Sequence, residues 1–490
     1  MADLETELDI ELIKRRSMSG IVTLTLRTFF IFIFSYIAWF ILTIVLDEST
    51  YGIFFVVQSM LNILIYFSDI GLAAALVQKK GNLSKTDLST TFTIQQVIIL
   101  TIVFLGLAFS SKIANFYHLD YQGLTLFRIL VFSLFLSSLK TIPSILLERD
   151  LKFTRFVIPQ IAEQLVFFTT AVVLALLNFK IASFYWAVLL RGIVGLILIY
   201  ILSPWKPSLS FNKESAKKLI SFGIPFQVNS ILALLKDDLL VLFLGKALPF
   251  SQVGYIGWSQ KVSQLPLRFF LDNVNKVTFP AYSRLQNTKD HLAKAVEKSL
   301  FFITYLVFPA ALGIAAIAPV FVEVIPKYSK WAPALPLLYL FSLNTAIAAI
   351  STTFTNVLFA IGRPQVVLRL MIFWVIITWG LTVPLISKFG YLGVGLASLF
   401  VSLTSLSTIY FVKREINVNI GKNIFGPLIS SLFMFVSAVG LLRLFPHNFF
   451  GLIFVVILGA IIYFAVSFAI LKNHLKEDFF VILKSLMNKS

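Results

Sequence analysis

Long apolar runs separated by short polar, charged stretches dominate the pattern of the chain. Runs such as Phe29–Phe34 and Leu452–Phe468 are apolar on every face, whereas a membrane β-barrel alternates apolar and polar residues in short segments. The runs therefore predict membrane-spanning α-helices, each of about 20 residues or more. The fourteen expected spans lie at 19–46, 51–78, 87–111, 122–146, 154–178, 181–203, 219–245, 250–280, 296–325, 332–359, 365–387, 391–412, 423–445 and 449–471.

Composition agrees with this pattern. The chain of 490 residues is 58% hydrophobic and 13% charged, whereas an average soluble domain is roughly 25% charged. We therefore expect an all-α polytopic membrane protein and exclude a soluble enzyme, a disordered chain and a fibre. Cysteine is absent, the four histidines are far apart in sequence, and no P-loop pattern occurs. We accordingly expect no cofactor, no metal site and no direct use of ATP.

The positive charges follow the connectors between spans. With the N-terminus in the cytoplasm, the cytoplasmic connectors and their flanks hold 25 Lys and Arg, and the outer connectors hold seven. Cytoplasmic loops of membrane proteins are enriched in Lys and Arg. This bias predicts that both termini are cytoplasmic and explains the net charge of +18 without a nucleic-acid partner.

An internal repeat relates the two halves at an offset of 202 residues. Leu46-x5-Gly52 recurs as Leu248-x5-Gly254, and Asn62 pairs with Gln264. The offset spans six helices, so the halves have the same orientation in the membrane. The expected organisation is an N-terminal lobe with spans one to six, a cytoplasmic linker, a C-terminal lobe with spans seven to twelve, and spans thirteen and fourteen with a cytoplasmic tail. These parts cover residues 1–203, 204–218, 219–412 and 413–490.

Five segments carry a resemblance to a known family: Asp47–Gly52, Ser68–Leu72, Leu147–Phe153, Gly245–Tyr255 and Phe389–Gly395. They resemble segments of the Wzx-type oligosaccharide-lipid flippases, which are polysaccharide transporters of the multidrug/oligosaccharidyl-lipid/polysaccharide exporter superfamily. The resemblance covers essentially the whole chain. It implies two six-helix lobes around a central cavity, alternating access, and transport of an undecaprenyl-diphosphate-linked sugar unit.

Nine Lys and Arg fall inside the expected spans: Arg27, Arg128, Lys140, Arg191, Lys236, Lys261, Arg268, Lys276 and Arg369. An ionisable side chain in hydrocarbon is costly and normally faces a cavity or a partner. Arg128, Lys140, Lys276 and Arg369 are near span ends, where long side chains can reach the interface. Arg191 and Arg268 lie near the midplane, which makes them the strongest candidates for binding an anion.

Span eight carries the clearest local pattern. Lys261, Gln264, Arg268, Asp272 and Lys276 share one face if the helix turns by about 100° per residue. Span two has a weaker counterpart in Gln58, Asn62 and Asp69. Two such faces could line a water-filled cleft between the lobes. The alternative is a buried polar ladder that pairs with neighbouring helices.

Three acids could couple transport to an ion gradient. Asp237 and Asp238 follow Lys236 in span seven, and Glu163 lies in span five. The alternative is that these acids only balance nearby cations such as Lys236 or Arg268. The candidate substrate-binding residues are Arg27, Arg191, Lys236, Lys261, Gln264, Arg268, Gln58 and Asn62.

The resemblance implies a flippase and no enzymatic activity. The expected partners are the polyprenyl-diphosphate-linked glycan, the lipid bilayer of a bacterial cytoplasmic membrane, and potentially a glycan polymerase machinery. A multidrug/cation antiporter of the same superfamily is the first alternative, although its substrates would favour an acidic cavity. A membrane glycan polymerase or ligase would need a sizeable outer loop, and the outer connectors here are short. A structural scaffold would not need buried charge on two related faces.

Overall fold

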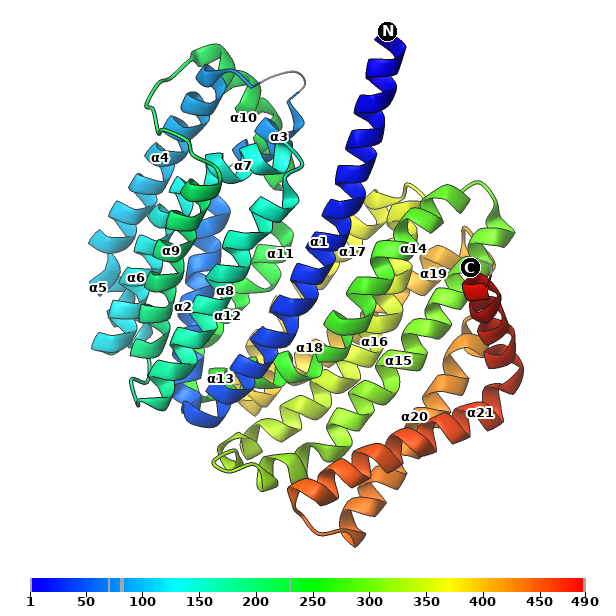
Figure 1. Ribbon diagram of the computed structural model, residues 1–490. Helices are drawn as coiled ribbons and strands as arrows, with labels where there is room; N and C mark the ends of the chain where they lie inside the picture. The colour runs from blue at the N-terminus through cyan, green and yellow to red at the C-terminus, as the bar shows by residue number, and fades with distance from the viewer. Residues whose placement is uncertain (1, 69–70, 80–82, 229–230, 488–490) are drawn as a thin grey trace. The chain divides into compact units, whose positions relative to one another are not determined.

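The computed structural model describes residues 2–68, 71–79, 83–228 and 231–487, and every regular element in these ranges is a helix (Figure 1). The chain forms two compact units, residues 1–254 and 255–490. The helices of unit 1 are α1 (Ala2–Val45), α2 (Glu48–Ser68), α3 (Leu72–Gln78), α4 (Lys85–Ala108), α5 (Ser110–Tyr117), α6 (Tyr121–Leu139), α7 (Thr141–Arg149), α8 (Phe153–Leu176), α9 (Ala182–Leu202), α10 (Lys213–Val228), α11 (Ile231–Lys236) and α12 (Asp238–Ala247).

Helix α13 (Phe250–Ser263) crosses the boundary between the units. Unit 2 continues with the π-helix η1 (Leu267–Leu271), α14 (Asp272–Leu285), α15 (Lys289–Val324), the 3-10 helix η2 (Ser329–Ala334), α16 (Leu335–Ala360), α17 (Pro364–Phe389), α18 (Leu392–Ser405), α19 (Ser407–Lys413), α20 (Ile420–Leu444) and α21 (Phe449–Met487).

Twelve helical segments of the described chain are long and apolar enough to cross a membrane. Each corresponds to an expected span, so the prediction of an all-α polytopic membrane protein is confirmed. The two expected spans that are not among the twelve, 219–245 and 250–280, are interrupted: the first consists of α10, α11 and α12, and the second of α13, η1 and α14. Counting these two gives a number consistent with fourteen.

In unit 1, α8 packs along both α9 and α1, and α6 contacts α9, α4 and α2. Glycines allow close approach between helices, as is common in membrane proteins. Gly192 of α9 lies against Leu136 of α6, and Gly106 of α4 lies against Val131 of α6. The arrangement brings one face of α8, on which Glu163 lies, against α9.

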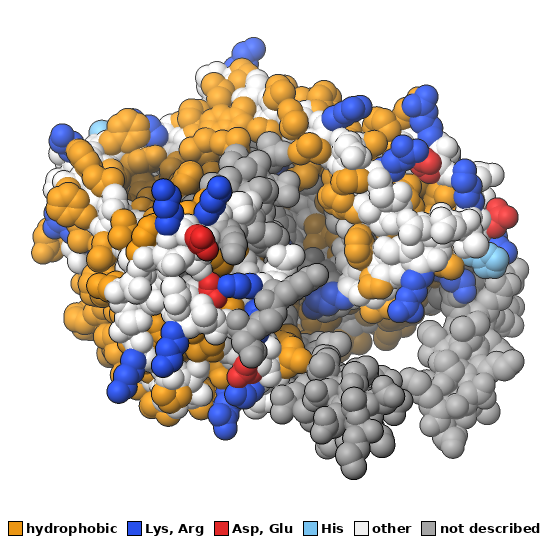
Figure 2. All heavy atoms as spheres, turned by 90° about the horizontal axis from the view of Figure 1, so that it is seen from above, with side chains coloured by type: hydrophobic (Ala, Val, Ile, Leu, Met, Phe, Trp, Pro, Cys, Tyr) orange, Lys and Arg blue, Asp and Glu red, His pale blue; other side chains and the backbone are white. Residues whose placement is uncertain are grey.

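The end of unit 1 at which α3, α7 and α10 lie has its own apolar core, which includes Leu72, Leu76 and Ile142. Lys and Arg side chains stand along this end, and few Asp or Glu are visible among the described side chains there (Figure 2). This distribution supports the expectation that the end is cytoplasmic, although the orientation itself stays a prediction.

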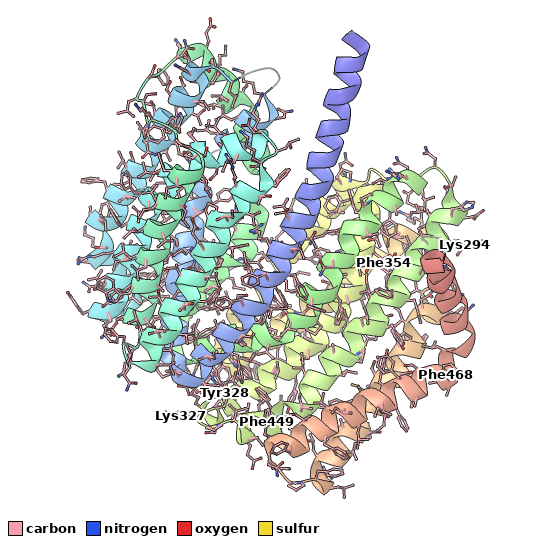
Figure 3. The ribbon with its side chains drawn as sticks, in the orientation of Figure 1. Lys294, Lys327, Tyr328, Phe354, Phe449 and Phe468 are labelled. Atoms are coloured by element: carbon pink, nitrogen blue, oxygen red, sulfur yellow. The ribbon has the colours of Figure 1, made fainter. Side chains whose placement is uncertain are left out.

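In unit 2, α15 packs against α16 and α20, and α18 packs against α16 and α17. Phe354 belongs to a buried cluster near the Lys294 end of α15, and Tyr328 lies at the opposite end (Figure 3). There the buried rings of Trp258 and Trp331 stack at 5.5 Å, and the Trp258 indole N–H donates to the Tyr328 hydroxyl at 3.0 Å. Aromatic and amphipathic rings of this kind are typical of the ends of membrane spans.

The boundary between the two compact units lies after Gly254, which is later in the chain than the expected linker at 204–218. It groups α10–α12 with the first six spans because α12 packs on α2, and α10 packs on α3 and α4. Helices that pack together need not belong to the same sequence repeat. The assignment of 204–218 as the linker between lobes therefore stays a prediction.

The two glycines that the repeat relates meet inside unit 1. A Cβ at Gly52 would overlap the carbonyl of Phe250, and a Cβ at Gly254 would overlap the carbonyl of Glu48. Glu48 and Phe250 are themselves 202 residues apart. The crossing is therefore reciprocal, in the register of the predicted repeat, and only residues without a side chain fit at its centre.

Candidate functional site

A largely enclosed charged group lies at Glu163 of α8, whose side chain is 12% exposed. Lys140, between α6 and α7, donates from Nζ to Glu163 Oε1 at 2.6 Å. On the other side, Arg191 Nε of α9 lies 3.7 Å from Glu163 Oε2. The side chains of Lys140 and Glu163 are 15% and 12% exposed, and that of Arg191 is 40% exposed. Two cations therefore share one carboxylate, and the group has a net charge of +1.

Small and aromatic residues hold this group in place. A Cβ at Gly195 of α9 would overlap the Glu163 carboxyl, so glycine makes the space in which the carboxyl lies. The Arg191 guanidinium lies over the ring of Phe167, with its carbon 5.8 Å from the ring centroid. Such cation–π contacts stabilise a cation outside water. Lys140, which the sequence assigns to snorkelling, is instead a buried partner of Glu163.

Arg27 lies on α1 close to the same depth. The rings of Phe34 and Phe168 are 6.3 Å apart, and α1 and α8 run in the same direction (Figure 1). Seven residues before this pair are Arg27 and Ile161, about 10 Å back along each helix. Arg27 is thus within about one turn of the level of Glu163. Its Nε is buried without a hydrogen-bond partner in the described part of the chain.

The candidate residues of spans two and seven come together. Gln58 donates to Asn62 at 3.1 Å, and Asn62 donates to Asp238 Oδ1 at 2.9 Å. This chain of hydrogen bonds joins α2 to the start of α12. Lys236 Nζ is 3.5 Å from the exposed carboxylate of Asp237. The contacts keep both predicted roles of these acids open, because each acid pairs with a neighbour and each is also partly exposed.

Asp237 stands at a break in span seven. The regular helix is interrupted at this one residue (φ −100°, ψ −67°), which separates α11 from α12. Interrupted helices are tolerated in membranes where they are buried in protein or line a cavity. The sequence shows charged residues at this position, but it has no glycine or proline there from which the break in the helix could be predicted.

The polar face of span eight lies on an irregular helix. Pro266 lacks a backbone N–H, which removes one α-helical hydrogen bond, and the π-helix η1 follows at once with Arg268 inside it. Gln264, Arg268 and Lys276 are exposed, and Lys261 is half-buried. The expected stripe assumed about 100° per residue throughout. A π-helix turns by less, so residues beyond η1 are rotated from the predicted line.

Asp69 lies outside the described residues, and so does the side chain of Asp272. Gln58, Asn62, Lys236, Asp237 and Asp238 lie on adjoining helices of unit 1. Arg27, Arg191 and Glu163 form a second group in the same unit, and Gln264 and Arg268 belong to unit 2. The polar faces therefore resolve into three local groups.

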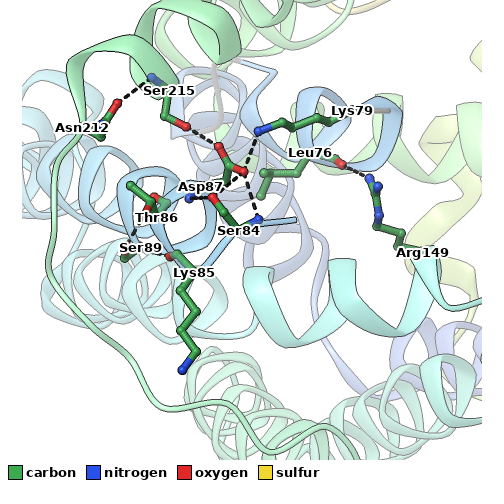
Figure 4. Close-up of polar contacts among 10 residues, drawn as sticks. All are labelled: Leu76, Lys79, Ser84, Lys85, Thr86, Asp87, Ser89, Arg149, Asn212 and Ser215. Carbon is green, nitrogen blue, oxygen red and sulfur yellow. Dashed lines mark hydrogen bonds and ion pairs between the residues drawn. The ribbon is translucent and has the colours of Figure 1, made fainter. Parts of the chain in front are cut away.

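One polar cluster was missed by sequence reasoning. Asp87, in the first turn of α4, accepts from Lys79 Nζ at 2.5 Å, from the Ser84 hydroxyl at 2.7 Å and from the Ser215 hydroxyl (Figure 4). Arg149 of α7 donates to the carbonyl of Leu76 in α3 at 2.7 Å. The Ser84-x-x-Asp87 capping box was a signal that could have revealed it. The cluster joins the first turn of α10 and the end of α3 to the start of α4, and it has a structural role.

Comparison with known proteins agrees with this architecture. A family model described as "Polysaccharide biosynthesis protein" matches residues 41–336. The lipopolysaccharide biosynthesis protein WzxC of Escherichia coli (strain K12) is 21% identical over 417 residues, which is 82% of this chain and 81% of WzxC. The succinoglycan biosynthesis transport protein ExoT of Rhizobium meliloti (strain 1021) is 26% identical over 204 residues, covering 42% of this chain and 40% of ExoT.

Among solved structures, the lipid II flippase MurJ in an inward closed conformation superposes with a TM-score of 0.75 and 16% identity, covering 92% of this chain and 99% of MurJ. At this identity the similarity establishes the fold. These findings confirm the resemblance stated from the sequence. Because the family model covers more than half of its length, the chain belongs to the polysaccharide biosynthesis protein family.

Proposed function

We propose that this protein is a flippase that moves a polyprenyl-diphosphate-linked oligosaccharide from the inner to the outer leaflet of a bacterial cytoplasmic membrane. Membership of the polysaccharide biosynthesis family supports this proposal, as does the MurJ-like fold. WzxC and ExoT, which are named for polysaccharide biosynthesis and transport, are consistent with transport rather than catalysis. Translocation proceeds by alternating access of the two lobes.

The observation that carries the proposal is the excess of cations at mid-depth. Arg191 shares the carboxylate of Glu163 with Lys140, and Arg268 is exposed within the π-helix η1. A diphosphate in a low-dielectric cleft needs cations, and the planar guanidinium matches phosphate oxygens better than an ammonium does. Arg27 and Lys261 add positive charge. A cation antiporter would need the opposite balance.

The other parts of the substrate follow from their chemistry. Sugars bind to polar and aromatic side chains, and Gln58, Asn62 and Gln264 supply amides for this purpose. The polyprenyl chain remains in lipid. Asp237 and Asp238 are the candidates for coupling to a proton or sodium gradient, and Glu163 is the third. A glycan polymerase would act on the product at the outer face and is the partner we expect.

The orientation belongs to the same proposal. Both termini and the linker at 204–218 lie in the cytoplasm. A topology reporter fused after Lys217 should be active inside the cell only. Activity restricted to the outside would reverse the orientation and, with it, the direction assigned to transport.

The function is tested by deleting the gene in its native host. We expect surface glycan to disappear while lipid-linked oligosaccharide accumulates in the inner leaflet, and the parental gene to restore both. A membrane glycan polymerase or ligase would instead leave single repeat units in the outer leaflet. Accumulation there would contradict the flippase. Unchanged surface glycan and unchanged lipid-linked oligosaccharide would exclude both activities.

A further inference from the structure

The two cations beside Glu163 contact its carboxylate differently. Lys140 Nζ makes a direct hydrogen bond to Oε1, and both side chains are largely buried. The nearest approach of Arg191 is from Nε to Oε2, at 3.7 Å, which is beyond hydrogen-bond distance. The negative charge of Glu163 is therefore balanced mainly by Lys140, and the charge of Arg191 is left over.

The remaining contacts fix Arg191 without covering its outer nitrogens. Its guanidinium lies on the Phe167 ring, and its Nε faces Glu163. No hydrogen bond engages its two Nη atoms in the described part of the chain, and the side chain is 40% exposed. The Nη pair is the edge of the guanidinium that binds phosphate oxygens in a two-pronged fashion. Phe167 and Glu163 therefore hold the guanidinium on one side, and its two Nη atoms remain accessible to a ligand.

We infer that Glu163 is a positioning residue for Arg191, that Lys140 is its neutralising partner, and that Arg191 is the diphosphate contact of unit 1. This inference rests on the proposed function, and it decides whether Glu163 couples transport to an ion gradient. Glu163 ceases to be a candidate for ion coupling, and that role falls to Asp237 and Asp238.

The charges that face Glu163 argue for this choice. Lys140 and Arg191 contact it from two other elements, and Arg27 on α1 lies near the same depth. A proton bound at Glu163 would leave Lys140 as an unbalanced buried cation, which is costly. Gly195 packs directly on the carboxyl, so a hydrated cation does not fit on that side of it. A carboxylate in this setting stabilises the local geometry.

Binding of farnesyl diphosphate to the purified full-length protein tests the inference directly, because this short lipid diphosphate needs no translocation. We expect Arg191→Ala to weaken binding by about 10-fold or more, the size of a lost charge-assisted hydrogen bond. Glu163→Gln should weaken it by a similar factor. The double variant should lose little more than either single one, because the two residues act as a unit.

Two further variants separate positioning from folding. Gly195→Ala keeps every charge but displaces the Glu163 carboxyl, and it should weaken binding in the same direction. Lys140→Met combined with Glu163→Gln removes the buried pair without leaving an uncompensated charge, so the protein should fold and still bind weakly. The matched control is the exposed pair Lys152–Asp150, whose double neutralisation should leave binding unchanged.

The dependence of transport on an imposed ion gradient gives the second readout. In vesicles, Glu163→Gln should slow transport and keep the ratio of rates with and without the gradient. Loss of the gradient response in Glu163→Gln would overturn the inference and make Glu163 the coupling residue. Unaltered farnesyl diphosphate binding in Glu163→Gln would also overturn it. If the parental protein binds the probe but moves no lipid-linked oligosaccharide, the proposed function fails and the contact assignment stands.

Discussion

Helix α2 and the segment α13–η1–α14, which the predicted repeat relates to each other, differ in regularity. Helix α2 is unbroken from Glu48 to Ser68 and is apolar enough to count as a membrane span. Its counterpart is interrupted after Ser263 and passes through a π-helix before it continues. The first carries the amides Gln58 and Asn62, and the second carries cations.

The difference begins with one residue. Pro266 has no counterpart at the equivalent position in α2, which is occupied by Leu64. Removing one backbone N–H changes the hydrogen-bond pattern and the direction of the side chains that follow. Helical irregularities of this kind often occur at functional sites. We propose that α13–η1–α14 contacts the anionic part of the substrate and that α2 makes polar, neutral contacts.

The largest effect is expected at Arg268. Arg268→Ala should lose most transport activity without loss of folded protein, because one charge-assisted contact contributes about 1.5 to 3 kcal/mol, or roughly 10- to 150-fold. Arg268→Lys should keep part of the activity, since it retains the charge but not the planar fork. Glycan export is the measurement. Export at the parental rate from Arg268→Ala would move the anion site to Arg27 and α1.

The second-largest effect is expected at Asp237 and Asp238, the acids near α2. If Asp237 or Asp238 carries the coupling ion, Asn at that position should abolish gradient-dependent transport and leave substrate binding largely intact. Asn62→Ala, which removes the hydrogen bond to Asp238, should reduce the response less, because the carboxylate remains. Transport at the parental rate in the double Asp→Asn variant would reassign both acids to structural pairing.

Substitutions at Gly52 and Gly254 test whether the chain crosses itself as closely as described at these two glycines. Gly52→Val or Gly254→Val should lower the melting temperature in detergent, because overpacking costs about 1 to 3 kcal/mol. Gly440→Ala in α20, where a Cβ would meet nothing within 4 Å, is the matched control and should be neutral or mildly stabilising. Equal stability of all three variants would show that the crossing is not tightly packed.

Pro266→Ala should have the smallest effect. It restores a backbone donor, so it is expected to regularise η1 and to reduce transport severalfold by turning Arg268 from its place. Stability should rise slightly or stay unchanged, because a helix-breaking residue is removed. The check is the transport rate against the amount of folded protein. Parental transport in this variant would mean that the π-helix has no part in positioning Arg268.

Much of the fold could be predicted because the bilayer imposes a simple rule on sequence. Apolar runs of sufficient length become helices, and twelve expected spans correspond to helices that satisfy the criterion. The rule also explains the two exceptions. Span seven carries the charged run Lys236-Asp237-Asp238 and span eight carries four charged residues, and the breaks at Asp237 and Pro266 occur among them.

The candidate site was harder to predict because it depends on tertiary partners. Depth along a helix singled out Arg191, but only packing reveals that Lys140 and Glu163 form a pair behind it. Lys140 sits at the end of α6 in sequence, and its long side chain reaches inward to α8 rather than outward to the interface. Helical periodicity likewise placed Arg268 on a polar face but could not anticipate the π-helix that alters its direction.

Translocation by the purified protein in sealed vesicles tests the central claim most directly. Polyprenyl-diphosphate-linked oligosaccharide is placed in one leaflet, and an impermeant glycosidase reports the fraction that reaches the other. We expect the parental protein to expose the lipid-linked sugar much faster than protein-free vesicles do, and Arg268→Ala to slow this about 10-fold or more. A parental rate equal to that of protein-free vesicles would contradict the flippase.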